Sequence, residues 1–291
     1  MEDSASGTVK WAPEVKRGRS LDPAKRLRCL HDHLVKAYGP QKWWPAETAF
    51  EVIIGAYLTQ NTAWKAVERS LANLRRVGAL SIEGLRNLPP DELQELIRPS
   101  GFHSRKAPAM KAFVAMLDAE FGGSLDTLAA TPTVDLRSRL LSLPGVGPET
   151  ADAILLYALK HPVPVADEYL RRIAERHRLI DPPPQRNRRE YDSLVQLTRQ
   201  AFAPDPSHEW AQLFNEFHAL TVAVGKAHCG RIPRCADCPL VADLPPGSAM
   251  RGESEREMVI QEWRAKVKNQ KKRFTRSQVN LFSTTADQGK A

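Results

Sequence analysis

Leu143-Pro-Gly-Val-Gly-Pro-Glu-Thr-Ala151 is the stretch that decides the fold of this 291-residue chain. It predicts a tight turn that opens directly into a helix, because apolar side chains recur at helical spacing from Ala151 to Leu159. Gly145 and Gly147 allow a sharp turn and a close approach of the backbone to another group. Backbone N–H groups at such a turn, together with a helix N-terminus, predict a site for an anion such as a phosphate.

The composition fits a soluble protein that binds a polyanion. Lysine and arginine total 42 against 34 aspartates and glutamates, which leaves a net charge of +8. No apolar run is long enough to span a membrane, and the N-terminus does not resemble a secretory signal. We therefore expect a cytoplasmic, nucleoid-associated protein. Its four cysteines, three of them clustered, favour metal binding over disulfides.

Helical patterning dominates the chain from about residue 21 onward. Between residues 48 and 159, short joints containing proline or glycine separate one apolar-periodic segment from the next. Neither strand-like alternation nor a repeat of fixed period occurs. The sequence therefore predicts an all-α fold.

The opening stretch resembles the helix-hairpin-helix motif of the endonuclease III-like DNA glycosylases. In that family a catalytic aspartate lies 24 residues after the leading leucine, which is the spacing from Leu143 to Asp167 here. The resemblance covers roughly residues 27–244, and the joint 97–107 is similar to the family's Gly-aromatic-x-x-Lys-Ala loop. The motifs are closest to the endonuclease III-related and 3-methyladenine glycosylase branch.

The resemblance implies a particular architecture. It consists of two helical domains with a DNA-binding cleft between them, an iron–sulfur cluster loop, and a monomeric state. The implied division is a six-helix domain with the hairpin at 46–159 and a second domain of 21–45 plus 160–250. Outside these domains, polar composition predicts a disordered tail at 1–20 and a disordered basic tail at 269–291, and helical patterning predicts a terminal helix at 251–268.

Asp167 is the expected catalytic residue. Cleavage of an N-glycosidic bond builds positive charge on the sugar, and a fixed carboxylate stabilises that charge and activates water. Asp167 also suits the N-cap of a helix starting at Glu168, and the two roles are compatible.

Glu149 departs from the family pattern. Members that also cleave the strand carry a lysine at this hairpin position, whose amine attacks the sugar. A carboxylate cannot form that Schiff base, so we expect base removal without strand cleavage unless Lys65 or Lys226 substitutes.

Further DNA contacts follow from the resemblance. Gln60, in the loop with Asn61, matches a glutamine that fills the gap left by a flipped base, although both residues also suit helix caps. Gly145, Gly147 and Thr150 are the expected hairpin contacts.

Two adjacent tryptophans are candidates for the base pocket. Trp43 and Trp44 precede the first core helix, and their π faces suit a cationic N-alkylated purine. Such a base is already a good leaving group, so one aspartate can suffice. Ordinary packing is the alternative role for these rings.

The cysteine cluster predicts a soft-metal centre. Cys229, Cys235 and Cys238 approximate the family's [4Fe–4S] pattern, but the first gap is one residue short and Leu244 stands where the fourth cysteine belongs. Asp243 is the favoured fourth ligand, with Cys29 and His228 as alternatives, and zinc is the alternative metal.

The C-terminal tail carries one further motif. Gln278-Val-Asn-Leu-Phe282 resembles the peptide that binds the bacterial sliding clamp. Taken together, the sequence predicts a glycosylase that removes a damaged base, expected to be an alkylated purine, from duplex DNA. A glycosylase or lyase for oxidised pyrimidines or mismatched thymine, and a non-catalytic lesion-binding module, are the rival hypotheses.

Overall fold

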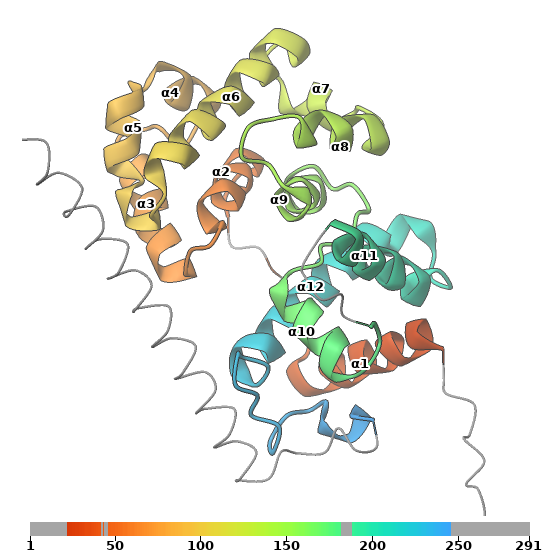
Figure 1. The fold of residues 1–291 in the computed structure, drawn as a ribbon. Coiled ribbons are helices and arrows are strands. Elements are labelled where there is room, and N and C mark those ends of the chain that lie inside the picture. The colour runs from red at the N-terminus through yellow and green to blue at the C-terminus, as the bar shows by residue number, and fades with distance from the viewer. Residues whose placement is uncertain (1–21, 42, 44–45, 182–187, 246–291) are drawn as a thin grey trace, which may run out of the picture.

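The computed structural model describes residues 22–41, 43, 46–181 and 188–245. Helices are the only regular elements in these residues, which contain no strand, and this confirms the all-α prediction (Figure 1). None of the described helices is long and apolar enough to cross a membrane. The expected tails, the terminal helix at 251–268 and Gln278–Phe282 lie outside the described residues.

One group of helices is built from the segment 46–159. Its members are α2 (Ala49–Thr59), α3 (Trp64–Arg76), α4 (Ile82–Asn87), α5 (Pro90–Leu96), α6 (His103–Phe121), α7 (Leu125–Ala129), α8 (Thr133–Leu141) and α9 (Pro148–Ala153), with a 3₁₀ turn, η1, at Arg98–Ser100. The sequence predicts six helices here and the structure has these eight, of which α4, α5, α7 and α9 have only 6, 7, 5 and 6 residues. Apolar periodicity cannot be read over so few residues.

The second group combines the first described helix with the C-terminal half (Figure 1). It contains α1 (Pro23–Tyr38), α10 (Glu168–Arg176), α11 (Arg188–Phe202) and α12 (Trp210–Ala227), with 3₁₀ turns η3 at Ser207–Glu209 and η4 at Val241–Asp243. Within the group, α1 packs against α11 and α12, and α12 packs against α10. The division into two separate domains stays a prediction.

A π-helical turn connects the two groups. The apolar run after α9 does not continue as a regular α-helix, because Ile154–Ala158 forms a π-helical turn, η2. Its five residues are all buried, and the turn contacts α2, α9 and α12. π-helical turns are rare and occur often at functional sites. The sequence pattern therefore identified an apolar helical continuation but not its widened geometry.

Candidate functional site

The hairpin between α8 and α9 has the turn that the sequence predicts. Gly145 has φ +74°, in the left-handed region, and a Cβ there would lie 3.3 Å from the Ala109 side chain. Gly147 has an extended backbone with open space around it, so its conformation does not itself require glycine. Leu143 and Val146 are buried and anchor the turn, while both glycines are exposed.

Gln60 joins the α2–α3 loop to the hairpin. Its side-chain amide donates to the Gly145 carbonyl at 2.9 Å and to the Thr150 hydroxyl at 2.9 Å. Asn61 follows in the left-handed region, with φ +51°, and is exposed. The structure thus brings together Gln60, Gly145 and Thr150, three of the residues predicted to contact DNA.

Lys106 supports this loop from within the fold. Its ammonium donates to the Leu58 carbonyl at 2.7 Å, the Thr62 hydroxyl at 2.7 Å and the Ser100 carbonyl at 3.0 Å. Burial lowers the pKa of Lys106 to about 8. The sequence identified the loop containing this lysine by its pattern, but nothing in the pattern indicated which backbone segments the lysine joins.

A second feature of the same region escaped the sequence analysis. Phe102 is 58% exposed and has φ +49°, an unfavourable backbone conformation for an aromatic residue, just before α6 begins. Its neighbour Ser100 accepts from the Thr62 hydroxyl at 2.6 Å. An exposed aromatic side chain therefore stands next to the Gln60 loop.

Asp167 lies at the N-cap of α10. One carboxylate oxygen, Oδ1, accepts from the Leu170 backbone N–H at 2.8 Å, and the residue is 9% exposed. The other oxygen, Oδ2, is 3.5 Å from Nε2 of His218 on α12. Asp167 therefore has the capping role that the sequence suggested, and one oxygen remains outside the cap.

An aromatic cluster surrounds the partner of Asp167. The Tyr157 hydroxyl is hydrogen-bonded to Nδ1 of His218. The Trp43 ring packs against both, with centroid distances of 5.9 Å to Tyr157 and 5.6 Å to His218. One of the two tryptophans predicted to line the base pocket is thus close to Asp167, while Trp44 lies outside the described residues.

The hairpin helix is attached to the second group through Asp152. This carboxylate is fully buried and receives two hydrogen bonds from Arg137 of α8, at 2.6 and 2.9 Å. It also accepts from the Tyr191 hydroxyl of α11 at 2.8 Å. Burial, and then Asp152, raise the pKa of Tyr191, to which the exposed Glu149 also contributes.

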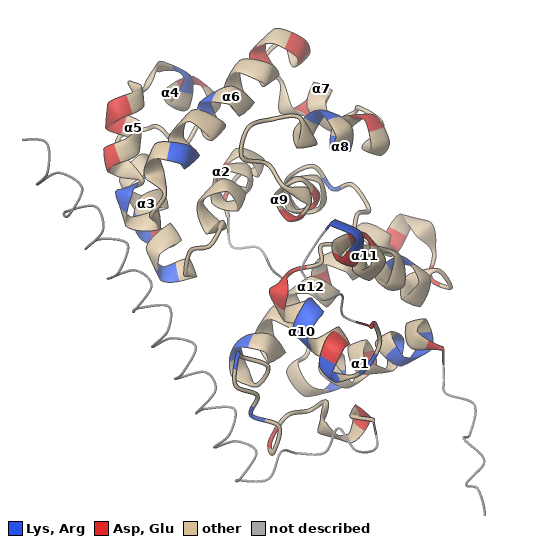
Figure 2. Ribbon diagram, viewed as in Figure 1, with Lys and Arg blue, Asp and Glu red and all other residues tan. Residues whose placement is uncertain are grey.

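The lysines considered as substitutes for a hairpin lysine are both exposed. Lys65 lies in the first turn of α3 and Lys226 in the last turn of α12. Figure 2 shows lysine and arginine on both groups of helices, mixed with aspartate and glutamate. The positive net charge is therefore not confined to one element.

The three clustered cysteines share the loop after α12. Burial raises the thiol pKa of Cys229 and of Cys238, and charge on the other cysteines of the loop adds to each shift. The Cys229 sulfur also accepts from Arg176 at 2.9 Å. The loop is thus joined to α10 through the contact between Cys229 and Arg176.

The proposed fourth ligands have other partners. The Asp243 carboxylate is 2.7 Å from Nδ1 of His33, and Nδ1 of His228 is 3.2 Å from the Arg234 carbonyl. Cys29 is exposed on α1. Within the described part of the chain, no group of three His, Cys, Asp or Glu residues is arranged to hold a metal. The loop thus supplies thiol donors of the type that a soft metal prefers.

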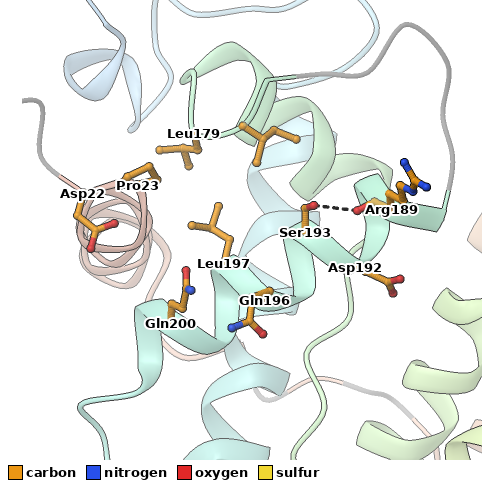
Figure 3. Close-up of a pocket in the computed structure, with 10 residues that line it drawn as sticks. Asp22, Pro23, Leu179, Arg189, Asp192, Ser193, Gln196, Leu197 and Gln200 are labelled. Carbon is orange, nitrogen blue, oxygen red and sulfur yellow. Dashed lines mark hydrogen bonds between the residues drawn. The ribbon is translucent and has the colours of Figure 1, made fainter.

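A pocket of about 730 Å³ lies away from these residues, between α1 and α11 (Figure 3). Asp22, Leu179, Arg189 and Gln196 are among the residues that line it. None of its lining residues was predicted as a site residue, so the pocket does not correspond to the predicted base pocket.

Comparison with known proteins identifies the family. The model of the HhH-GPD superfamily base excision DNA repair proteins matches residues 54–196. The "Putative DNA repair glycosylase MJ1434" of Methanocaldococcus jannaschii is 39% identical over 213 residues, 72% of this chain and 92% of that protein.

Solved structures of DNA glycosylases have a similar fold. The 3-methyladenine DNA glycosylase of H. pylori, bound to 1,N6-ethenoadenine, superimposes with a TM-score of 0.60 at 29% identity, over 71% of this chain and 98% of that one. A non-covalent endonuclease III–DNA complex has a TM-score of 0.61 at 22% identity, over 77% and 96% of the two chains, and shows the same fold. By sequence and by fold, the chain belongs to the HhH-GPD superfamily of base excision DNA repair proteins.

Proposed function

We propose that this DNA repair glycosylase hydrolyses the N-glycosidic bond of an alkylated purine in duplex DNA and leaves an abasic site. The observation that carries the proposal is the Asp167 carboxylate, held at the start of α10 by the Leu170 N–H with its second oxygen outside the cap. A carboxylate held in this way stabilises the positive charge that develops on the sugar and activates the attacking water.

Water, not an amine, is the proposed nucleophile. Glu149 occupies the hairpin position at which strand-cleaving members of the resembled family carry lysine. A carboxylate cannot form a Schiff base. Lys65 and Lys226 lie on α3 and at the end of α12, outside the hairpin. We therefore propose a monofunctional enzyme.

The preference for alkylated purines rests on two supports. Trp43 packs beside His218, the neighbour of Asp167, so an aromatic surface lies close to the carboxylate. Aromatic rings attract cationic bases such as 3-methyladenine. The H. pylori relative, whose name and bound ligand both specify a modified adenine, is the second support.

Gln60 and the hairpin are the proposed DNA contacts. The exposed turn at Gly145 and Gly147 would approach a backbone phosphate, and Asn61 lies exposed beside it. Gln60 is hydrogen-bonded to Gly145 and Thr150, so its insertion into the duplex requires those two bonds to break. We propose that this exchange accompanies base flipping.

A panel of duplexes, each with one lesion, tests the substrate class. We expect base release from 3-methyladenine duplexes and none from thymine glycol, uracil or thymine opposite guanine. Release of an oxidised or mismatched pyrimidine in preference to 3-methyladenine would overturn the alkylation assignment. Binding to lesions without any release would favour a non-catalytic module.

We also propose that Cys229, Cys235 and Cys238 bind a metal centre, a [4Fe–4S] cluster in preference to zinc, with a structural role. Asp243 remains the proposed fourth ligand, although its carboxylate is paired with His33. Iron, sulfide and zinc analysis of the purified full chain, with its visible absorption spectrum, tests this proposal. A chain without iron or zinc would contradict it.

The proposed sliding-clamp contact involves Gln278–Phe282, outside the described residues. Deleting residues 277–291 should abolish binding to the bacterial clamp and leave base release from a short duplex unchanged. Equal clamp affinity of the full-length and truncated chains would remove the motif from consideration.

A further inference from the structure

Two polar side chains, from η2 and α12, lie in a row with the proposed catalytic carboxylate of Asp167. The Tyr157 hydroxyl of η2 is hydrogen-bonded to Nδ1 of His218 on α12. Nε2 on the other side of the same ring faces Asp167 Oδ2 at 3.5 Å. Neither Tyr157 nor His218 belongs to the motifs that identified the family, and they lie 61 residues apart in the chain.

All three side chains are almost completely removed from solvent. Tyr157 is 2%, His218 7% and Asp167 9% exposed. His218 Nε2 is buried and has no hydrogen-bond partner among the residues that the structure describes. A buried imidazole nitrogen without a partner is costly, so its direction toward a carboxylate calls for an explanation.

The two ends of the histidine favour one tautomer. Burial, and then the charges of Asp167 and Glu216, raise the pKa of Tyr157 well above 10, so its hydroxyl keeps its proton and can donate it to Nδ1. The ring proton then resides on Nε2, opposite Asp167. The other tautomer would place the Nε2 lone pair against the carboxylate, which is repulsive.

We infer that His218, held by Tyr157, is a positioning residue that orients the Asp167 carboxylate through its Nε2–H. The Leu170 N–H holds Oδ1, and an Nε2–H of His218 donated to Oδ2 would fix the carboxylate plane at both oxygens. The separation of 3.5 Å is long for a hydrogen bond, and such bonds often shorten only when substrate is bound. This inference rests on the catalytic role proposed for Asp167.

The arrangement also joins the carboxylate to the proposed base pocket. Trp43 packs edge-on against Tyr157, with an interplanar angle of 82°, and against His218. A bound base that displaces the Trp43 ring would therefore also shift His218, the residue that orients Asp167. The placement of the base and the orientation of the carboxylate would both depend on the packing of Trp43, Tyr157 and His218.

Two substitutions at His218 separate orientation from packing. His218→Leu removes the donor, and we expect single-turnover release of 3-methyladenine to slow about 10- to 100-fold, the range for loss of a hydrogen bond to a charged group. His218→Gln keeps an N–H near the same position and should recover most of that loss. Affinity for a duplex with a stable abasic-site analogue should be unchanged in both.

His208→Gln is the matched control. His208 precedes α12 and its side chain is 80% exposed, so this variant should release base at the wild-type rate. If His218→Gln is as slow as His218→Leu while both unfold at the wild-type temperature, the donor role is wrong. A wild-type rate in His218→Leu would equally overturn it.

Nitrogen NMR of the ¹⁵N-histidine-labelled full chain measures the tautomer without any assay of activity. The His218 signals, assigned by their loss in His218→Gln, should show a proton on Nε2, and Tyr157→Phe should shift the population toward Nδ1–H. A proton on Nδ1 with none on Nε2 in the wild type would contradict the inference.

The outcomes distinguish this inference from the proposed function. If Asp167→Asn is inactive and His218→Leu is fully active, the catalytic assignment stands and the role of His218 fails. If Asp167→Asn releases base at the wild-type rate, the catalytic assignment fails, and with it the purpose given to His218.

Discussion

At the scale of single residues, the position of Glu149 determines which reaction is expected. An exposed carboxylate on the hairpin helix cannot attack the sugar and keep it bound as an imine. Borohydride should therefore trap no covalent adduct between the wild-type chain and a damaged duplex, although base release continues. An adduct that forms in the wild type and disappears in Lys65→Met or Lys226→Met would contradict this prediction and restore a lysine mechanism.

The residues that sequence could identify are those that belong to a contiguous motif. The resemblance to the endonuclease III-like glycosylases points to Asp167, and the structure places it at the helix start that its residue type favours. Tyr157 and His218 could not be found in this way, because each is an ordinary residue of an apolar helix until the fold places it next to Asp167. Their roles depend on a contact between distant segments.

At the scale of elements, the loop between α2 and α3 depends on one buried lysine. Lys106→Met removes hydrogen bonds to Leu58, Thr62 and Ser100, and should lower the free energy of unfolding by about 1 to 3 kcal/mol at pH 7. Chemical denaturation measures the change. Lys65→Met, at an exposed site on α3, is the control and should change it little.

The same lysine predicts a dependence of stability on pH. The folded-state pKa of Lys106, about 8, lies below the usual 10.5, so above pH 8 the unfolded chain binds this proton more strongly. The stability of the wild type relative to Lys106→Met should therefore rise between pH 8 and pH 10.5, by on the order of 1 kcal/mol per pH unit. A difference that stays constant or narrows over this range would mean that the lysine is not buried as described.

The helices themselves show where sequence patterns are informative. The largely apolar segment Phe50–Leu58 of α2 forms an α-helix and is buried without exception, Glu51 included. The run after α9 was equally apolar, yet it forms the π-helical turn η2. Hydrophobic spacing does not distinguish these geometries, because a segment buried on all sides presents no polar face to reveal its period.

At the scale of the whole molecule, Asp152 connects the hairpin to the second group of helices. Its carboxylate binds Arg137 of α8 and Tyr191 of α11. Asp152→Asn weakens a buried ion pair, and we expect it to lower the free energy of unfolding by on the order of 2 to 4 kcal/mol. Denaturant titration followed by circular dichroism measures this.

An exposed pair of the same kind provides the comparison. Asp118 also receives two hydrogen bonds from one arginine, Arg86, but both side chains are at least one-third exposed. Asp118→Asn should therefore change the unfolding free energy by less than about 1 kcal/mol. Equal effects of the two substitutions would show that burial of the Asp152 pair contributes nothing.

The catalytic role proposed for Asp167 connects the hairpin, the aromatic cluster and the family assignment, and single-turnover base release tests it most directly. Wild type and Asp167→Asn should bind a 3-methyladenine duplex with similar affinity, since the amide also accepts a hydrogen bond from the helix start. Release of free 3-methyladenine should be lost in the variant, because no carboxylate remains to stabilise the sugar cation. Release at the wild-type rate by a folded Asp167→Asn would contradict the mechanism.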